Sequence, residues 1–479
     1  MKASLALTAL GTALLAACGQ QAQPPTTQAQ ATGTPGLYLI VYKDQSIPVK
    51  PMAAAPGGKI VQAIPQIGVA SAFLTPGQAL ALRAAPNVAG VAAQTMHVVP
   101  EAAALPIEVV QPSGASTLAP DAVPIGPTSQ DTYWKNQWNV RRVGAPAAWK
   151  RVSPEKQAKV TVAVIGGGVM DDHPDLAGAV AYAKGTSICP EEGGPNHSTA
   201  YPYYRRFVDL TRGSDPYVCG MASGVVMDAG GTMMAGMIAG RFGGGAMVGV
   251  APFVKLAACK VYDRMFTGTY IISGWFDASV LAAIADAAEH GFPIIALNVW
   301  RIHAQGDPMI LAWQRAIKFA TARGSLIVAV AASLGPSSWT PGQQAETLAV
   351  ARTSTTQILF GPENVAAPGS DMLASYYPSG ARVDIAAPGG GNPPAGGSWW
   401  DYYIIAPAPP FFGGPAYASG AADEYAVDHA AGVAALVKAK YPNLTPALLR
   451  FWLQATAERI GPRDQFGAGM VNAQRATMF

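Results

Sequence analysis

Charge is scarce in this sequence, and the two signs nearly cancel. Charged residues make up 13% of the 479-residue chain, with 32 Lys and Arg against 29 Asp and Glu and a net charge of +3. Such a small surplus gives no reason to expect a nucleic-acid or strongly acidic partner. Half of the residues are hydrophobic, which predicts a globular body with a large core.

The sequence also lacks an apolar run of the roughly 18 residues that a membrane-spanning helix needs. The apolar stretch 3–17 follows Met1 and Lys2 and is shorter than that, so residues 1–17 are predicted to be a signal peptide. The stretch ends in Leu-Ala-Ala before Cys18, which resembles a bacterial lipobox. The alternative is an ordinary signal peptide whose cleavage site contains a cysteine. We expect an exported lipoprotein at the cell surface or in the periplasm, tethered to the membrane only through lipidated Cys18.

Cysteine is rare, with four in the whole chain. Cys189 and Cys219 lie in loop regions rich in Gly and Pro and could pair in an oxidising compartment. Cys259 lies in an apolar run and is predicted to be a buried strand residue. No cysteine spacing indicates a zinc site, and no cofactor is predicted. A calcium site is left open.

The first part of the predicted mature chain changes character twice. Residues 18–36 are mainly Gln, Pro, Thr, Ala and Gly, and predict a disordered stalk. Residues 37–100 hold short strand-like runs, the last of them a predicted strand pair at 88–99, and a helix that starts at Thr75-Pro76. They predict a small α+β domain. Residues 101–130, rich in Pro, Ala and Ser, predict a linker.

Residues 131–479 predict one large α/β domain. Continuous apolar strands alternate with helices there, a pattern typical of a mostly parallel sheet covered on both faces. The predicted strands are 160–165, 254–261, 294–299, 325–331, 347–351 and 383–387, and the clearest helices are 278–289 and 308–323.

Several segments of this domain resemble motifs of the subtilisin-like serine peptidases, the subtilases of peptidase family S8. The segments are 137–149, 162–169 with 173–176, 228–240, 327–336 and 418–437. The resemblance implies the subtilisin-like three-layer α/β fold with its mostly parallel central sheet. It also implies that residues 37–100 are an inhibitor-type (I9-like) prodomain; an unrelated small α+β domain is the alternative.

The resemblance also locates the family's catalytic positions, and none of them carries the family's residue. The aspartate falls on Gly166, the histidine on Gly230 and the nucleophilic serine on Glu424. The oxyanion asparagine falls on Ser333. No Ser, Thr or Cys lies between Gly420 and His429 to replace the nucleophile.

Two of these positions have other interpretations. The glycines at 166–168 follow a strand, but the G-x-G-x-x-G spacing of a phosphate-binding turn fails at Asp171. Glu424 starts a helix, where the helix dipole favours negative charge. We therefore interpret Glu424 as a helix-start residue rather than a catalytic carboxylate.

Bulky residues replace the strand that lines the family's substrate cleft. Residues 298–302 stand where the family has N-M-S-L-G, and Trp300 and Arg301 are bulky there and are expected to fill space that a peptide needs. The sequence thus predicts a catalytically inactive pseudopeptidase that acts as a binding or interaction module. Its expected partners are its own prodomain and a peptide or protein ligand. The alternative is an active subtilisin-like serine endopeptidase.

Overall fold

A computed structural model of the chain describes most of the sequence. The described residues are 35–45, 59–95, 97–99, 105–106, 126–185, 229–266, 271–299, 301–332, 335, 337–374, 382–391, 393–394, 397–408 and 416–479. The predictions for five residues fall outside them: Cys18, Cys189, Cys219, Trp300 and Ser333. The predicted signal peptide lies outside them too.

A mostly parallel sheet forms the centre of the body. The strand order of this eight-stranded sheet is β19-β16-β14-β12-β7-β9-β8, and β20 pairs with β16 beside this path. All pairs are parallel except β16 with β19. The strands are β7 Thr161–Gly166, β8 Val180–Gly185, β9 Lys255–Lys260, β12 Ile294–Leu297, β14 Leu326–Val330, β16 Leu348–Thr355, β19 Asp371–Leu373 and β20 Ile385–Pro388. Each strand predicted from the sequence is found, with small shifts at the ends.

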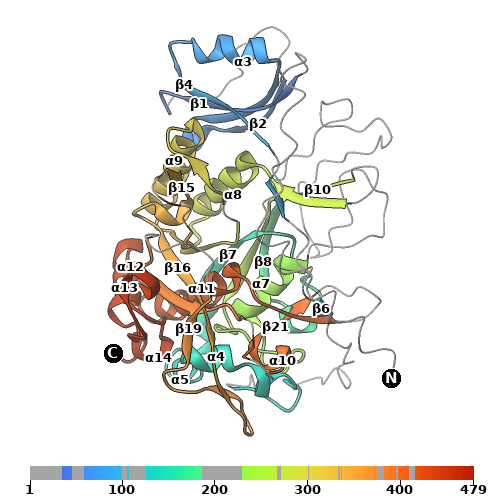
Figure 1. The fold of residues 1–479 in the computed structure, drawn as a ribbon, viewed down its shortest axis with the longest axis vertical. Coiled ribbons are helices and arrows are strands. Elements are labelled where there is room, and N and C mark those ends of the chain that lie inside the picture. The colour runs from blue at the N-terminus through green and yellow to red at the C-terminus, as the bar shows by residue number, and fades with distance from the viewer. Residues whose placement is uncertain are drawn as a thin grey trace.

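Helices cover both faces of this sheet, which gives the body three layers (Figure 1). Alternate side chains of β7 enter two different cores, as the two-residue period of a strand requires. Val162 and Val164 pack with α7 and α11, whereas Ala163 and Ile165 pack with α8 and α9. This confirms the predicted α/β fold. The four helices are α7 Ala229–Ala239, α8 Asp277–Glu289, α9 Pro308–Ala322 and α11 Asp423–Lys440.

The N-terminal unit is an antiparallel sheet in the order β2-β3-β1-β4, drawn in blue in Figure 1. One face of it packs under helix α3 around Tyr38, Ile40 and Ala79. The other face, with Leu37 and Leu39, joins the core of α8 and α9. Both faces are buried, which explains the uninterrupted apolar run of β1. The elements are β1 Gly36–Tyr42, β2 Lys59–Ile64, η1 Pro65–Ile67, β3 Val69–Leu74, α3 Pro76–Arg83 and β4 Val88–Ala93.

The predicted strand pair at the end of this unit was wrong. Strand β4 pairs with β1, and the next strand, β5 (His97–Val99), pairs with β11 (Ile271–Trp275) of the body. An edge strand accepts any chain of suitable length, so the sequence pattern indicates a strand but not its partner. A further short strand, β6 (Leu105–Pro106), lies within the predicted linker and pairs with β22 (Ala416–Gly420).

Shorter elements complete the body. They are η2 Trp134–Asn136, α4 Trp138–Arg142, α5 Ala145–Trp149, α6 Pro154–Gln157, η3 Pro174–Leu176, β10 Tyr262–Phe266, β13 His303–Ala304, β15 Ser338–Trp339, η4 Pro341–Gln343, β17 Ile358–Leu359, β18 Val365–Ala366, α10 Trp399–Tyr402, β21 Ile404–Ala408, α12 Pro446–Ala455, α13 Arg463–Phe466 and α14 Ala473–Ala476. Within the described part of the chain, no helix has the length and apolar character needed to cross a bilayer.

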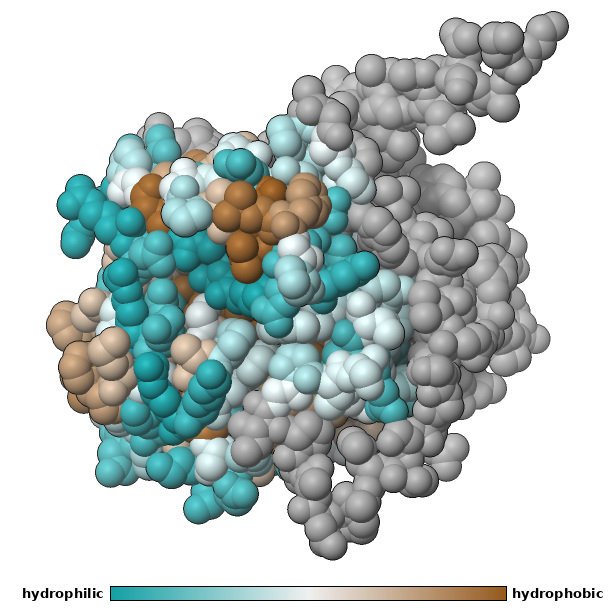
Figure 2. Space-filling view, turned by 90° about the horizontal axis from the view of Figure 1, so that it is seen from below, coloured by the Kyte–Doolittle hydropathy of each residue, from teal (hydrophilic) through white to brown (hydrophobic). Residues whose placement is uncertain are grey.

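The surface is mixed in character. On the face seen in Figure 2, a compact apolar group lies among hydrophilic side chains. Among the described residues, the exposed large hydrophobic side chains come from several elements: Leu80, Leu311, Leu359, Phe360, Met372, Leu448, Phe451, Met478 and Phe479.

Candidate functional site

The first turn of α7 lies directly against the end of β7. A Cβ atom at Gly231 would sit 2.4 Å from the carbonyl oxygens of Gly167 and Gly168, so only glycine permits this approach. Gly230, which precedes it, belongs to the same turn. At Gly166 a Cβ would make an ordinary contact, 3.4 Å from the Sδ of Met234. The structure therefore brings Gly166 and the start of α7 to one place.

The first turn of α11 reaches the same place. The Tyr425 hydroxyl donates to the Sδ of Met233 on α7 at 3.6 Å. Glu424 is half-buried in this turn, and neighbouring Asp423 lies 3.7 Å from the guanidinium of Arg352. The cap residue Ala422 makes no side-chain hydrogen bond, so acidic side chains at the helix start are the available complement to the helix dipole. This agrees with the helix-start interpretation of Glu424.

A second acid lies one turn further along α11 and was missed in the sequence. Asp428 is fully buried, and neither of its carboxyl oxygens has a hydrogen-bond partner. Asn298, at the end of β12, is fully buried too, and its amide atoms have no partner. Burial raises the pKa of Asp428 well above its ordinary value; the neighbouring Asn298 amide offsets part of this, and the charge of Glu424 adds to it.

Asn298 connects this acid to the end of β7. A Cβ at Gly166 would lie 3.7 Å from the Cβ of Asn298. The place where Gly166, α7 and α11 meet therefore has a buried carboxyl group close to it, whose pKa is raised by that burial.

Asp428→Asn is expected to raise the free energy of unfolding at pH 8 by about 1–3 kcal/mol. The folded state raises the pKa of Asp428. Its stabilising contribution is therefore complete below the unfolded pKa of about 4 and is lost as the pH rises toward the folded value. Urea unfolding at pH 4 and pH 8 measures the difference, which should be small at pH 4. Asp423→Asn is the control and should not stabilise at pH 8. Equal effects of Asp428→Asn at both pH values would contradict the assignment.

Two short strands of the N-terminal region flank this place. Val261 N–H donates to Gly166 O at 2.9 Å, and the next residue, Tyr262, begins the hairpin of β10 and β11. β5 pairs with β11 on this side. On the other side, β22 ends at Gly420, just before α11, and pairs with β6. The chain on both sides of residues 100–104 is therefore paired with strands that border the candidate site.

The matches to known proteins agree with this geometry. The Subtilase family model, Peptidase_S8, matches residues 157–469. Subtilisin Savinase of Lederbergia lenta is 28% identical over 342 residues, which cover 71% of this chain and 98% of that protein. Thermitase of Thermoactinomyces vulgaris is 25% identical over 355 residues, which cover 74% and 100%. The chain belongs to the subtilase family.

Solved subtilases share the fold over most of the chain. The epidermin leader peptide processing serine protease (EpiP) of Staphylococcus aureus superposes with a TM-score of 0.64 at 19% identity, covering 93% of this chain and 98% of that one. Fervidolysin of Fervidobacterium pennivorans gives a TM-score of 0.59 at 21% identity, covering 93% and 61%. At these identities the likeness shows the fold.

In this subtilase, Arg301 makes contacts that the sequence did not indicate. Its Nη1 donates to the carbonyl oxygen of Thr95 at 2.9 Å, and its Nη2 donates to the Thr95 hydroxyl at 2.8 Å. Nη1 also lies 3.4 Å from a carboxylate oxygen of Asp277. The guanidinium is thus held between the N-terminal unit and the start of α8.

Asp277 is the centre of a buried polar network. It accepts from Trp313 Nε1 at 2.7 Å and from His303 Nε2 at 3.1 Å, and the other ring nitrogen of His303 lies 3.3 Å from Asp307. Burial alone would raise the pKa of Asp277, but the charges of Arg301 and His303 hold it well below its ordinary value. Burial alone would lower the pKa of His303, but Asp277 raises it to about 9. His303 is therefore charged at neutral pH and donates from both nitrogens.

Two further histidines near the family motifs, His173 and His429, and the one cysteine among the described residues, Cys259, lie in packed surroundings. His173 caps η3 and accepts from Asp175 N–H at 3.2 Å. His429 is fully buried, with Nδ1 2.6 Å from Tyr425 O and Nε2 2.6 Å from Asn139 Nδ2. Cys259 is buried in β9 as predicted, and burial raises its thiol pKa to about 12. Among the described residues, no group of three or more His, Cys, Asp or Glu side chains could hold a metal.

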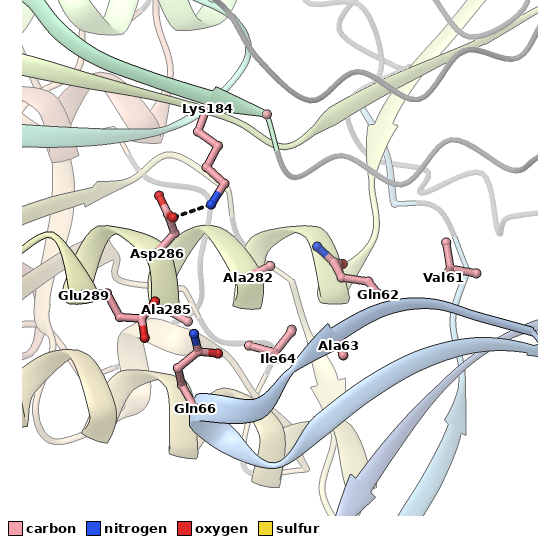
Figure 3. A pocket seen from close by; sticks show the side chains of 11 residues that line it. Val61, Gln62, Ala63, Ile64, Gln66, Lys184, Ala282, Ala285, Asp286 and Glu289 are labelled. Atoms are coloured by element: carbon pink, nitrogen blue, oxygen red, sulfur yellow. Dashed lines mark hydrogen bonds and ion pairs between the residues drawn. The ribbon is translucent and has the colours of Figure 1, made fainter. Parts of the chain in front are cut away.

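A cavity of about 300 Å³ opens elsewhere, between β2 of the N-terminal unit and helix α8 of the body (Figure 3). Lys184 and Asp286 form an ion pair of 2.6 Å in its wall. Gln62 and Gln66 face them from the N-terminal side. None of the motif positions lines this cavity, so it is separate from the candidate site.

Proposed function

We propose that this subtilase does not cleave peptide bonds and acts as a binding or interaction module. Peptide hydrolysis by this family needs a hydroxyl nucleophile, an imidazole that takes its proton and a carboxylate that orients the imidazole. The corresponding positions carry Glu424, Gly230 and Gly166. The observation that supports the proposal is that the segments carrying these positions, the end of β7 and the first turns of α7 and α11, adjoin in the fold, while the positions themselves carry none of the three groups.

The distribution of changes supports the same proposal. Scaffold segments such as 383–390 and 432–437 keep the family pattern, whereas all triad positions, the oxyanion position and the cleft strand differ together. In subtilisin, loss of the triad serine or histidine lowers turnover by about 2 × 10⁶-fold, a magnitude measured on that enzyme and not on this chain. Residual acceleration there is about 10³–10⁴-fold over water and depends on oxyanion donors, which differ here as well.

The proposal also covers the location of the protein and whether its N-terminal unit is removed. We place the protein outside the cytoplasm as a lipoprotein anchored through Cys18. We also propose that residues 37–100, a prodomain of the inhibitor type, stay covalently attached, because a chain without a triad cannot remove them. The pairing of β5 with β11 and of β6 with β22 supports an attached N-terminal unit.

The second candidate function is that of an active subtilisin-like serine endopeptidase. Membership of a family of serine endopeptidases favours it. It requires that a hydroxyl and an imidazole meet somewhere else in the body.

Incubating the purified protein with casein and with a serine-directed phosphonate probe tests the proposal. The expected results are no casein fragments above a buffer blank and no labelled residue, with Subtilisin Savinase as the positive control. Because the phosphonate reacts only with an activated hydroxyl, labelling of any residue in 131–479 would establish the second candidate instead.

A further inference from the structure

Strand β5 is too short to hold its place by pairing alone. It is the edge strand of a three-stranded sheet in the order β10-β11-β5 and meets β11 at only three positions, Val99 with Ser273, Val98 with Gly274 and His97 with Trp275. The ring of His97 also packs on the ring of Trp275, with 4.4 Å between the centroids. Further contacts must fix the strand.

These contacts come from Gln94 and Thr95, which lie just before β5 in the sequence. Gln94 accepts from Ala278 N–H at 3.0 Å, which satisfies an amide in the first turn of α8, and donates to Ser71 Oγ at 2.7 Å. Thr95 accepts twice from Arg301. The chain is therefore attached to the body immediately before it enters β5.

The Thr95–Arg301 contact is supported by a cluster of balanced charge. The carboxylates of Asp277 and Asp307 alternate with the cations of Arg301 and His303. Asp277 is fully buried, and the Arg301 side chain is 17% exposed. Hydrogen bonds from a fixed, desolvated guanidinium are among the strongest in proteins, so the cluster makes Arg301 a rigid donor for Thr95.

We propose that Arg301, supported by Asp277 and His303, is a latch that holds strand β5 against β11 through its contacts with Thr95. This inference rests on the proposed function, because the latch matters only where the N-terminal unit stays attached to the body. It changes the role of Arg301: the residue attaches the N-terminal unit by its Thr95 contacts instead of only filling the cleft.

Hydrogen exchange measured by mass spectrometry on the full chain tests the latch. In Arg301→Ala, the amides of His97–Val99 and Ile271–Trp275 should exchange at least about tenfold faster than in the wild type, since local opening follows the loss of local contacts. The amides of β14 should not change. Thr95→Ala keeps every charge and removes one acceptor, so a smaller acceleration of the same amides is expected.

Arg315→Ala is the matched control. Arg315 also joins the body to the N-terminal unit, but through the carbonyl oxygen of Tyr42 at 2.6 Å. Its loss should leave the exchange of β5 unchanged. Wild-type exchange of β5 in both Arg301→Ala and Thr95→Ala would overturn the latch, and Thr95→Ala decides the matter if Arg301→Ala fails to fold.

Intact mass separates a failure of the latch from a failure of the proposed function. A wild-type chain broken between Val99 and Leu105 would overturn the proposed function, whatever the exchange rates. An intact chain in which β5 exchanges as fast as an unpaired segment would overturn the latch alone.

Discussion

A chain carrying Gly166→Asp, Gly230→His, Glu424→Ser and Ser333→Asn is expected to gain peptidase activity. The substitutions supply the orienting carboxylate, the general base, the nucleophile and an oxyanion donor. The expected increase in casein hydrolysis over the wild type is large, because each triad member in subtilisin is worth about 10⁴–10⁶-fold in turnover.

The structure has room for the first of these substitutions. An aspartate at Gly166 needs room for a Cβ at the end of a buried strand, and the nearest atoms there lie at 3.4 and 3.7 Å, which are ordinary contacts. The serine at 424 would stand in the first turn of α11, where backbone N–H groups point outward. The fixed approach of α7 at Gly231 keeps residue 230 beside the end of β7.

The restored chain should also cut itself. β5 and β6 are paired with strands that border the site, so we expect the cut to fall between Val99 and Leu105. Intact mass after expression should show two fragments divided between these residues. The wild type should remain one chain. A mature form that starts near Asp131, found without any added protease, would contradict the proposal.

The matched control is the variant with Gly166→Asp, Gly230→His and Ser333→Asn that keeps Glu424. It should give neither casein fragments nor phosphonate labelling, because it lacks a nucleophile. If the fourfold variant folds but shows neither casein hydrolysis nor phosphonate labelling, the motif alignment has placed the wrong residues in the site.

The sequence predicted the scaffold because burial on both faces of a parallel sheet produces continuous apolar strands. β7, β9 and β14 were found within a residue or so of their predicted ends. The convergence of Gly166, Gly230 and Glu424 followed from motif resemblance, and the structure brings these segments together. What the pattern could not supply was pairing between distant chain segments, such as β5 with β11.

The buried polar groups also could not be predicted from the sequence. In the sequence, Asp428 is one of several polar residues in an Ala-rich helix, and nothing indicates that it is buried. The strand pattern gives no sign that Asn298 lies near it. The role of Arg301 depends on Thr95, 206 residues away in sequence. Only the three-dimensional arrangement shows that a residue expected to fill the cleft attaches the N-terminal unit.

Asp277→Asn is expected to lower the free energy of unfolding by about 3–5 kcal/mol, the usual cost of removing one partner from a buried ion pair. The substitution leaves the cations Arg301 and His303 in a site that burial has desolvated. It also weakens the hydrogen bond from Trp313 Nε1, which now spans 2.7 Å. Urea unfolding near pH 6 measures the loss. Trp313→Phe keeps every charge but removes a hydrogen bond and leaves a cavity at a fully buried side chain, so its cost should depend little on pH.

The pH dependence of this loss identifies its cause. Because Asp277 raises the pKa of His303 to about 9, the stability from this histidine is complete below its unfolded pKa of about 6.5 and is lost as the pH rises through 9. The pKa of Asp277 is lowered, so the carboxylate contributes above its unfolded pKa of about 4. The difference between wild type and Asp277→Asn should therefore be largest between about pH 4 and 6.5, and should shrink by pH 9–10 to the part that Arg301 sustains. A difference that stays constant from pH 5 to 10 would show that the loss comes from packing and not from the His303–Asp277 pair.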